Sequence, residues 1–524
     1  MYDLVLKGGL VYDGTGSKPF IADVAVKDGV IAEIGPGLRG KAQVELSGLS
    51  VAPGFIDIHS HSDTVFIEDD RCQAKLFQGV TTELSGQCGS TIYPCPIDKM
   101  DNIRKYAGAD KAEWASESLF SFLQKAEKAG IHPCVSQLPL IGHGALRCGV
   151  MGFEDRKATQ EELDEMCTLL DREMAFGAWG LSLGLGYTPG LSADIDELCA
   201  LGAVVAKYGG IITSHMRDQG EGTPKSLEEM FEINRRTGAH VHIAHFKASG
   251  NEVWGRAPEF EAILHKAAKD GINVTADLYP YNASSSGITN SFPKWAIQGG
   301  LDKAVARLDG PESVELMAFL NKKFQTQRDG EGLYIVTTNG KYPVADGKNI
   351  WQLSQELGLS MADTIAKVTK ETGAATSCIA FAMNDDDVHH MLSQNDFCIG
   401  SDGSCYPLDP SLNKGKPHPR NFGTFPRFLR LAREGLCPME TAVRRITGLS
   451  AETIGVEDRG FIKKGMTADI TVFDENTVTD TASFEDPISK PEGIIHVFVG
   501  GKAEILNGEQ TGVHQGRVVL KKVK

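Results

Sequence analysis

The feature that most restricts the fold of this chain is a regular alternation of short apolar runs with helical patterns. Eight runs have the length and composition of buried strands, and they are Gly54–His59, Val80–Leu84, Cys134–Ile141, Ala178–Leu183, Gly210–Ser214, His240–His245, Gly271–Asp277 and Phe397–Gly400. Helical stretches separate them, as in Gln160–Ala175, where apolar residues recur three or four positions apart. This alternation is typical of a parallel sheet covered by helices, and eight strands predict a (β/α)8 barrel. A doubly wound open sheet is the alternative, but the first strand lacks the Gly-rich phosphate turn of that fold.

Both ends of the chain carry a different pattern, in which short β-rich runs are joined by glycine turns. The N-terminal runs include Ala22–Lys27 and Val30–Ile34, and the C-terminal runs are Ala468–Phe473, Ile494–Val499 and Arg517–Leu520. We therefore expect a small β-sandwich formed by both termini, over residues 1–54 and 460–524, beside a barrel over residues 55–459. An insertion at about residues 291–342, with helical patterns at Asp302–Leu308 and Pro311–Lys323, separates the seventh strand from the eighth.

Composition and charge exclude several kinds of protein. The 524 residues include 69 acidic and 53 basic side chains, for a net charge of −16, so nucleic acid and anionic membranes are unsuitable partners. No run approaches the roughly 18 apolar residues of a membrane span, and the N-terminus lacks the basic and apolar regions of a secretory signal. The 11 cysteines form no C-x-x-C pair, which favours reduced thiols in a cytoplasmic protein. A homo-oligomer is possible, and the sequence leaves the oligomeric state open.

Histidines follow several of the expected strands, at the end where a barrel places its active site. His59 and His61 are two positions apart in an extended segment, so both imidazoles face the same side and can share a metal ion. One histidine also ends the fifth strand and one the sixth, at His215 and His245. Ordinary core or surface histidines are the alternative, but their shared position at strand ends favours metal binding.

A carboxylate and a thiol complete this set. Asp402 follows the eighth strand and precedes Cys-Tyr-Pro rather than a helix, so a catalytic carboxylate is favoured over a helix cap. Cys88 lies among small residues after the second strand, where a thiolate would favour Zn²⁺ over Mg²⁺, with a buried inert thiol as the alternative. His240 and His242 have the opposite parity to the histidine that ends their strand, so we expect them to face the other side and to be structural.

Longer motifs surround these residues. From residue 52 the chain reads Ala-Pro-Gly-Phe-Ile-Asp-Ile-His-Ser-His, and further motifs are Gly-Gln-Cys-Gly, Gly-Leu-Ser-Leu-Gly-Leu-Gly-Tyr-Thr-Pro-Gly, Ala-Asp-Leu-Tyr-Pro-Tyr-Asn-Ala-Ser-Ser-Ser-Gly and His-Pro-Arg-Asn-Phe-Gly-Thr-Phe-Pro-Arg-Phe-Leu. With these motifs the chain resembles the amidohydrolase superfamily, and within it the N-acyl-D-amino-acid deacylases, or D-aminoacylases. The resemblance covers essentially the whole chain and implies a metal-dependent hydrolase barrel with a terminal β-sandwich.

The resemblance also implies a zinc cofactor, with one tightly bound Zn²⁺ and a second, weaker metal position. In most binuclear relatives a carboxylated lysine from the fourth strand bridges the metals, but Ala178–Gly186 contains no lysine, so we expect Cys88 to take the bridging role. The positions that match ligands are Cys88, His215 and His245 for the tight site, His59 and His61 for the second position, and Asp402 at the eighth strand.

The same resemblance implies the catalytic and substrate-binding residues. Asp402 matches the catalytic acid and base, and Arg420, in His-Pro-Arg, matches the residue that binds the substrate α-carboxylate. The positions that match residues lining the substrate are Tyr187, Lys247, Tyr279 and Ser284, with Tyr281 as the alternative to Tyr279.

The activity so implied is zinc-dependent hydrolysis of a small-molecule N-acyl-D-amino acid, which releases a carboxylate and a free D-amino acid. A cyclic-amide hydrolase resembling hydantoinases or dihydroorotases is the alternative, disfavoured by Cys88 and by the missing fourth-strand lysine. A non-catalytic amidohydrolase-like scaffold is a third interpretation, disfavoured because every expected ligand is present. The acyl group and the preferred side chain stay open, and the D configuration rests on the resemblance.

Overall fold

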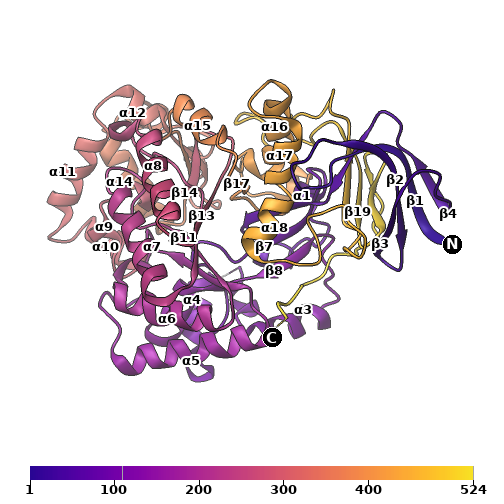
Figure 1. Cartoon of the computed structure of the whole chain (residues 1–524). Helices are drawn as coiled ribbons and strands as arrows, with labels where there is room; N and C mark the ends of the chain where they lie inside the picture. The colour runs from indigo at the N-terminus through magenta and orange to yellow at the C-terminus, as the bar shows by residue number, and fades with distance from the viewer. Residues whose placement is uncertain (109, 523–524) are drawn as a thin grey trace.

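The structure is a computed structural model that describes residues 1–108 and 110–522. Its centre is a barrel of parallel strands with helices around the outside (Figure 1). Two hydrogen-bonded sets of strands form the wall. On one side the sets meet where the single residue Leu140 separates β8 from β9. On the other side a parallel bridge between Ser60 and Gly403 closes the ring. The strands of the wall are β6 (Phe55–Ser60), β7 (Val80–Ser85), β8 (Ser136–Pro139), β9 (Ile141–Gly142), β10 (Gly180–Gly184), β11 (Ile211–His215), β12 (His240–Ile243), β13 (Val274–Leu278) and β17 (Cys398–Ile399).

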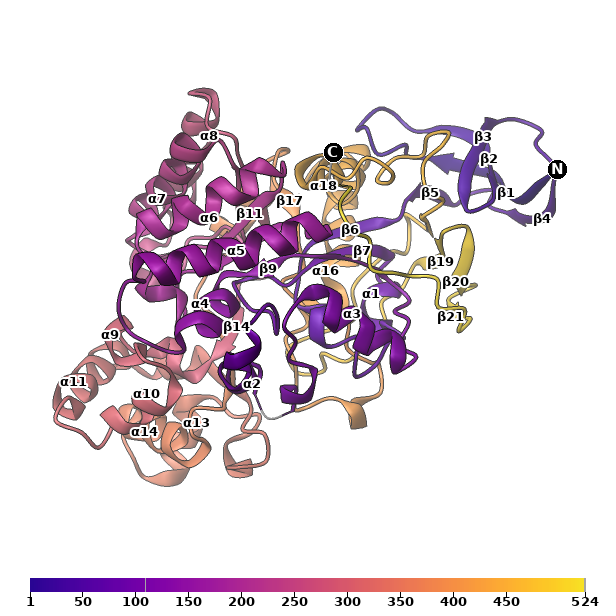
Figure 2. The same ribbon diagram turned by 90° about the horizontal axis from the view of Figure 1, so that it is seen from below.

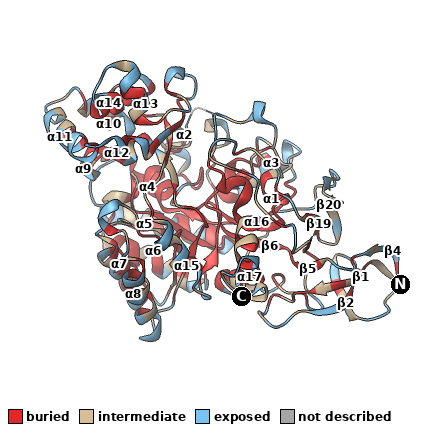
Figure 3. Ribbon diagram, turned by 90° about the horizontal axis from the view of Figure 1, so that it is seen from above, coloured by how far each residue is buried: buried red, intermediate tan, exposed pale blue. Residues whose placement is uncertain are grey.

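Each of the eight expected strands lies in this wall, and the predicted barrel is confirmed; the third expected strand is divided into β8 and β9. Every residue of β6, β7 and β10 is buried, as expected of parallel strands that are covered on both faces. Figure 3 shows the buried residues at the centre and the exposed ones on the outer faces of the helices.

The helices around the barrel form where the sequence carries both an apolar stripe and end signals. The expected helix at Gln160–Ala175 is α5 (Gln160–Phe176), which begins with a capping box between Thr159 and Glu162 and ends at Gly177 in a left-handed conformation. The other helices of this part are α1 (Gln73–Leu76), α2 (Met100–Ala107), α3 (Leu119–Lys128), α4 (His143–Met151), α6 (Ile195–Lys207), α7 (Thr223–Thr237), α8 (Ala257–Lys269), α15 (Asp385–Leu392), α16 (Arg420–Arg433), α17 (Met439–Arg445) and α18 (Gly448–Ile454). No helix within the described residues has the length and apolar character needed to cross a membrane.

Both ends of the chain contribute strands to one separate sheet, seen beside the barrel in Figure 1. The strands are β1 (Tyr2–Val11), β2 (Phe20–Lys27), β3 (Val30–Gly35), β4 (Gly40–Glu45), β5 (Ser50–Pro53), β18 (Ile470–Phe473), β19 (Ile494–Val499), β20 (Lys502–Leu506) and β21 (Glu509–Gln510). The expected strand at Arg517–Leu520 is not part of this sheet, because Val518 bridges to Gln137 of the barrel instead. The domain boundaries given above stay predictions.

Between β13 and β17 the chain forms a helical layer, seen at the lower left of Figure 2. This layer has its own core of buried apolar residues. The helices expected at Asp302–Leu308 and Pro311–Lys323 are α10 (Leu301–Arg307) and α11 (Ser313–Lys323). The other elements of this layer are β14 (Ser284–Gly287), α9 (Lys294–Ile297), α12 (Gln327–Glu331), β15 (Leu333–Thr337), α13 (Ile350–Leu357), α14 (Met361–Thr372) and β16 (Ser377–Ala380).

A buried charge cluster joins two of the barrel strands beneath the strand ends. Lys75 Nζ lies 2.6 Å from Asp57 Oδ2 and 3.1 Å from Glu83 Oε1, and none of the three side chains is exposed. Burial lowers the pKa of Lys75, but the two carboxylates more than offset this and keep the amine charged. Lys75 also donates to Ser401 Oγ at 2.7 Å, and Asp57 accepts the backbone N–H groups of His59 and Ser401. The cluster therefore holds the segments that carry His59 and Asp402.

Lys75→Met should lower the free energy of unfolding by about 3–5 kcal/mol, because it leaves two carboxylates buried without their cation. Urea unfolding followed by circular dichroism measures the change. The matched control is Lys266→Met on α8, where the ion pair with Asp270 is exposed to solvent and contributes little. Equal midpoints for the two variants would contradict the role given to the cluster.

Candidate active site

The carboxyl ends of the barrel strands bring the six expected metal ligands together. His59 lies in β6, His61 directly follows that strand, and His215 ends β11. The other three lie in the loops after β7, β12 and β17. The donor atoms form two groups, each with all its atoms within 4.8 Å of one another, and the groups are His59, His61, Cys88 and Asp402, and Cys88, His215 and His245.

Cys88 Sγ is common to both groups. It lies 3.5 Å from His59 Nε2, 3.5 Å from His245 Nε2 and 3.9 Å from His215 Nδ1. His215 Nδ1 and His245 Nε2 are 2.9 Å apart. Thiolate and imidazole donors at these separations surround a common point, as the ligands of a metal ion do.

Three of the six residues reach the site through an unusual backbone conformation. Cys88, His245 and Asp402 have φ values of 55°, 38° and 51°, in the left-handed region that residues other than glycine rarely occupy. Each such residue costs on the order of 1–3 kcal/mol, and it persists where the surrounding structure fixes it. Strain of this kind is typical of functional sites.

The loop that carries Cys88 packs directly on the end of the fourth barrel strand, β10. A Cβ added to Gly184, the last residue of β10, would lie 2.1 Å from the carbonyl oxygen of Cys88. The main chain of the loop therefore occupies the space that a side chain at the end of this strand would need. This close packing excludes any side chain at position 184, where the fourth strand ends, and lets Cys88 belong to both donor groups.

Sequence reasoning missed the residues that orient these ligands. Asp277 of β13 is fully buried; its Oδ1 accepts the backbone N–H of His245 at 2.9 Å, and its Oδ2 lies 3.4 Å from His59 Nδ1. Gln219 Nε2 lies 3.0 Å from His245 Nδ1. Such partners fix the tautomer and the ring direction of a metal-binding histidine. A signal for Asp277 was present, since it is a carboxylate near the end of an apolar strand, as Asp402 is.

The expectation that His242 faces away from the site is wrong. Its Nε2 lies 2.9 Å from Asp277 Oδ2, the same oxygen that faces His59. The parity argument fails because β12 ends at Ile243, and the left-handed turn at His245 breaks the alternation of a continuous strand. His242 thus belongs to the layer directly beneath the ligands.

The electrostatic environment favours the metal-binding form of three groups. Burial raises the pKa of Asp402, but Arg420, whose Nη1 lies 2.7 Å from Asp402 Oδ2, and nearby imidazoles hold it well below its usual range. Burial raises the pKa of Cys88 as well, and the surrounding imidazoles more than offset this. Burial and the charge of Lys247 lower the pKa of His245 to about 3. Carboxylate, thiolate and neutral imidazole are the forms that bind metals.

The pair His59 and His61 is in a different electrostatic position. Burial lowers the pKa of both rings, but Asp277, Asp402 and Cys88 more than offset this, and the pKa of His61 rises to about 9. Positive charge is therefore favoured at this pair, and a metal ion there must displace protons. The donor set as a whole fits a metal cofactor.

A chamber of about 620 Å³ opens over the donor groups. The ring centroids of Tyr187 and His215 are 4.4 Å apart. The side chains of Lys247 and Arg420 are buried in the wall of the chamber. The expected catalytic and substrate-binding residues that line the chamber are Tyr187, Lys247, Ser284, Asp402 and Arg420.

Tyr279 does not line this chamber. Its ring packs against both cations, with Lys247 Nζ 5.1 Å and Arg420 Cζ 5.0 Å from the ring centroid. Tyr281, the alternative, packs against Arg427 instead. Tyr279 therefore contacts the two cations of the chamber wall through cation–π packing.

Comparison with known proteins decides the family. Residues 43–503 match the amidohydrolase family. The chain belongs to this family. D-aminoacylase of Alcaligenes xylosoxydans xylosoxydans is 34% identical over 531 residues, which cover 99% of this chain and 98% of the relative. The predicted membership, the predicted D-aminoacylase branch and metal-dependent amide hydrolysis are confirmed.

Solved structures agree. The crystal structure of D-aminoacylase matches this amidohydrolase with a TM-score of 0.83 and 32% identity over 100% of both chains, and that protein has a binuclear metal centre. N-acyl-D-glutamate deacylase from Bordetella bronchiseptica matches with a TM-score of 0.83 and 28% identity over 99% of this chain and 100% of that one; it was solved with zinc and a phosphonate inhibitor that mimics the tetrahedral intermediate. L-hydantoinase from Arthrobacter aurescens, at 14% identity and a TM-score of 0.57, shares the fold alone. A metal cofactor and a small-molecule substrate are thereby supported for this amidohydrolase.

Cys88→Ala should deprive the amidohydrolase of its tightly bound metal, because this thiolate belongs to both donor groups. Elemental analysis after dialysis should find much less than one ion per chain, against at least one in the unchanged protein. The control is Cys167→Ala, a half-buried thiol on α5, which should keep the original metal content. Unchanged metal in Cys88→Ala would refute its role as a ligand.

Proposed function

We propose that this amidohydrolase is a zinc-dependent deacylase, which hydrolyses the amide bond of N-acyl-D-amino acids and releases a carboxylate and a free D-amino acid. The observation that carries the proposal is the pair of buried Arg420 with Asp402, 2.7 Å apart, beside the donor groups that share Cys88. The Arg420 guanidinium, which can bind the substrate carboxylate, therefore stands next to the Asp402 carboxylate, which can transfer protons during hydrolysis. The relatives support the substrate class, because they act on D-amino acid derivatives.

We assign zinc to the site, with one ion held tightly by Cys88, His215 and His245 and a second, weaker position at His59 and His61. Thiolate and imidazole ligands suit Zn²⁺, whereas Mg²⁺ prefers oxygen ligands. When bound, zinc supplies a Lewis acid and makes hydroxide available near neutral pH. The raised pKa values of His59 and His61 support a weaker second position, because protons compete with the metal there.

Asp402 is the proposed proton carrier. Its lowered pKa keeps the carboxylate ionised at neutral pH, so it can accept a proton from the attacking water and pass it to the leaving amine. The ion pair with Arg420 and the contact of Oδ1 with His61 Nε2, at 3.1 Å, hold the carboxylate in place. Proton transfer needs such a fixed geometry as well as the ionised state.

Arg420 is the proposed binder of the α-carboxylate. Its side chain is buried, yet its Nε has no hydrogen-bond partner among the described residues, which supports a ligand as the missing acceptor. A bidentate pair with a carboxylate would fix the orientation of the substrate. Lys247 and Tyr187 line the same chamber and can donate to the developing oxyanion, while Ser284 lines the substrate path.

A cyclic-amide hydrolase is the weaker candidate, since β10 contains no lysine and Cys88 stands between the donor groups. The proposal also places the enzyme in the cytoplasm, which its eleven free cysteines support.

The zinc-loaded protein should hydrolyse N-acetyl and N-formyl derivatives of D-amino acids and should leave the L-amino acid derivatives and hydantoins largely intact. Asp402→Asn should keep its zinc but lose turnover by about 10²–10⁴-fold, because the proton carrier is absent. The matched control is Asp409→Asn, an exposed carboxylate of the same loop, with unchanged turnover. Hydrolysis of hydantoins alone would overturn the proposed function, and an active Asp402→Asn would overturn the role of that residue.

Arg420→Lys should lower kcat/KM for N-acyl-D-amino acids by about 30-fold or more, chiefly through KM, because an ammonium group cannot form the bidentate pair. The internal control is an N-acyl amine of the same size that lacks the carboxylate, whose slow hydrolysis should change by a few-fold at most. Steady-state kinetics on both substrates measures the difference. Equal losses on the two would count against carboxylate binding by Arg420.

A further inference from the structure

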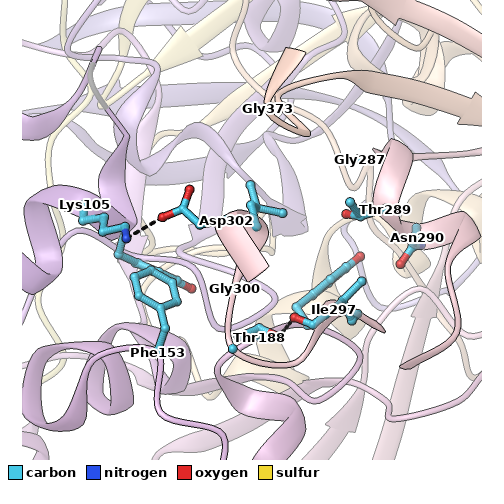
Figure 4. A pocket seen from close by; sticks show the side chains of 14 residues that line it. Lys105, Phe153, Thr188, Gly287, Thr289, Asn290, Ile297, Gly300, Asp302 and Gly373 are labelled. Carbon is cyan, nitrogen blue, oxygen red and sulfur yellow. Dashed lines mark hydrogen bonds and ion pairs between the residues drawn. The ribbon is translucent and has the colours of Figure 1, made fainter. Parts of the chain in front are cut away.

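A second cavity, here named the side cavity, opens beside the chamber and has a volume of about 470 Å³ (Figure 4). Of its described lining residues, only Lys105 and Asp302 are charged, and they pair with each other at 2.7 Å. Such a lining suits an apolar group better than an ionised one. The walls are formed mainly by Tyr106, Phe153, Tyr187, Ile297 and Leu301.

The side cavity adjoins the chamber, since four residues line both spaces. The shared wall lies beside the metal donors, because the ring of Tyr187 stands against that of His215, and the hydroxyl of Tyr106 donates to Gly89 O at 3.1 Å, in the loop that carries the thiolate. A group attached to a carbonyl at the donor atoms therefore has as neighbours the two tyrosine rings that also line the side cavity. The residues that line both spaces are Tyr106, Tyr187, Gly287 and Asn290.

Polar contacts at the edge of the side cavity join the barrel to the helical layer. Thr188 Oγ1, in the loop after β10, donates to Ile297 O of the helical layer at 2.8 Å. The ion pair of Lys105 with Asp302 joins α2 to α10. Figure 4 shows both contacts as dashed lines. The helical layer is thus fixed to the barrel with the side cavity between them.

The chemistry of deacylation decides which half of the substrate faces this space. The amino-acid half lies at Arg420, which binds its carboxylate, and its nitrogen must be within reach of Asp402. The acyl chain is bonded to the other side of the carbonyl carbon and so points away from Asp402. Tyr187, whose ring stands against that of the donor His215, lines the side cavity as well as the chamber.

We propose that the side cavity binds the acyl chain of the substrate, so that the enzyme prefers N-acyl-D-amino acids whose apolar acyl group is longer than acetyl. The inference rests on the proposed deacylase function and adds the acyl class that this function leaves open. Each methylene that becomes buried should raise kcat/KM about fourfold, by the usual free energy of apolar burial. The gain should appear mainly as a lower KM, because the contacts are remote from the reacting atoms.

The test compares N-acetyl, N-butyryl, N-hexanoyl and N-octanoyl derivatives of one D-amino acid, with zinc-loaded protein and its Gly287→Leu variant. Gly287 lines both the chamber and the side cavity, its φ of −74° suits any residue, and a Cβ there would have its nearest contacts at 3.7 and 3.8 Å. Leucine at this position should therefore narrow the space between the chamber and the side cavity without strain. The matched control is Gly287→Ala, which adds a single methyl group.

We expect kcat/KM to rise with chain length in the unchanged protein and in Gly287→Ala. In Gly287→Leu the rise should disappear while turnover of the N-acetyl substrate is retained. A second variant, Leu301→Trp, fills the side cavity from an exposed position. If Gly287→Leu also loses the N-acetyl activity, Leu301→Trp should still abolish the rise of kcat/KM with chain length.

Three other results would overturn the inference. The first is a preference of the unchanged protein for acetyl over every longer chain. The second is a chain-length profile that neither Gly287→Leu nor Leu301→Trp alters. The third comes from repeating the N-acetyl assay with D-amino acids of different size: a selective loss, in these variants, of those with large side chains would assign the side cavity to the side chain instead. Absence of turnover on every N-acyl-D-amino acid is distinguishable from these, since it would overturn the proposed function itself.

Discussion

The contact of one thiol with three imidazoles governs the active end of this barrel. Cys88 reaches its central position through a left-handed backbone, and its loop can lie there only because β10 ends in a glycine. Asp277 then holds the ligands from below, through the His59 ring and the His245 backbone. Such strain and such buried charges persist because the closed barrel over-determines the position of each strand end.

The charge of the whole protein says little about the charge of the substrate. The chain carries a net charge of −16, yet Arg420 and Lys247 are both buried at the chamber, packed on the ring of Tyr279. Buried charges are weakly screened, so these two cations act strongly at short range, whereas acidic groups on the outer surface are screened by water and salt. An acidic enzyme can therefore bind an anionic substrate through a few placed groups.

The strand ends and the surrounding walls contribute differently to the site. The ends of rigid strands carry the candidate metal donors and the proposed proton carrier, and the loops and the helical layer between β13 and β17 form the walls of the side cavity. Barrel enzymes vary their substrates by changing such walls while the chemistry at the strand ends is kept. The D-aminoacylase relatives thus inform the reaction more closely than they inform the acyl group.

The sequence by itself determined the barrel, the family and which six residues are candidate ligands, because apolar periodicity, motifs and the residues that directly follow each strand are local properties of the chain. It misled at Arg517–Leu520, since a short apolar run does not specify its partner, and at His242, since parity holds only while a strand continues. Only the tertiary structure decided the support by Asp277, the need for Gly184 and the side cavity. Each of these depends on contacts between residues far apart in the chain, and such contacts follow from how the strands close and how the loops pack.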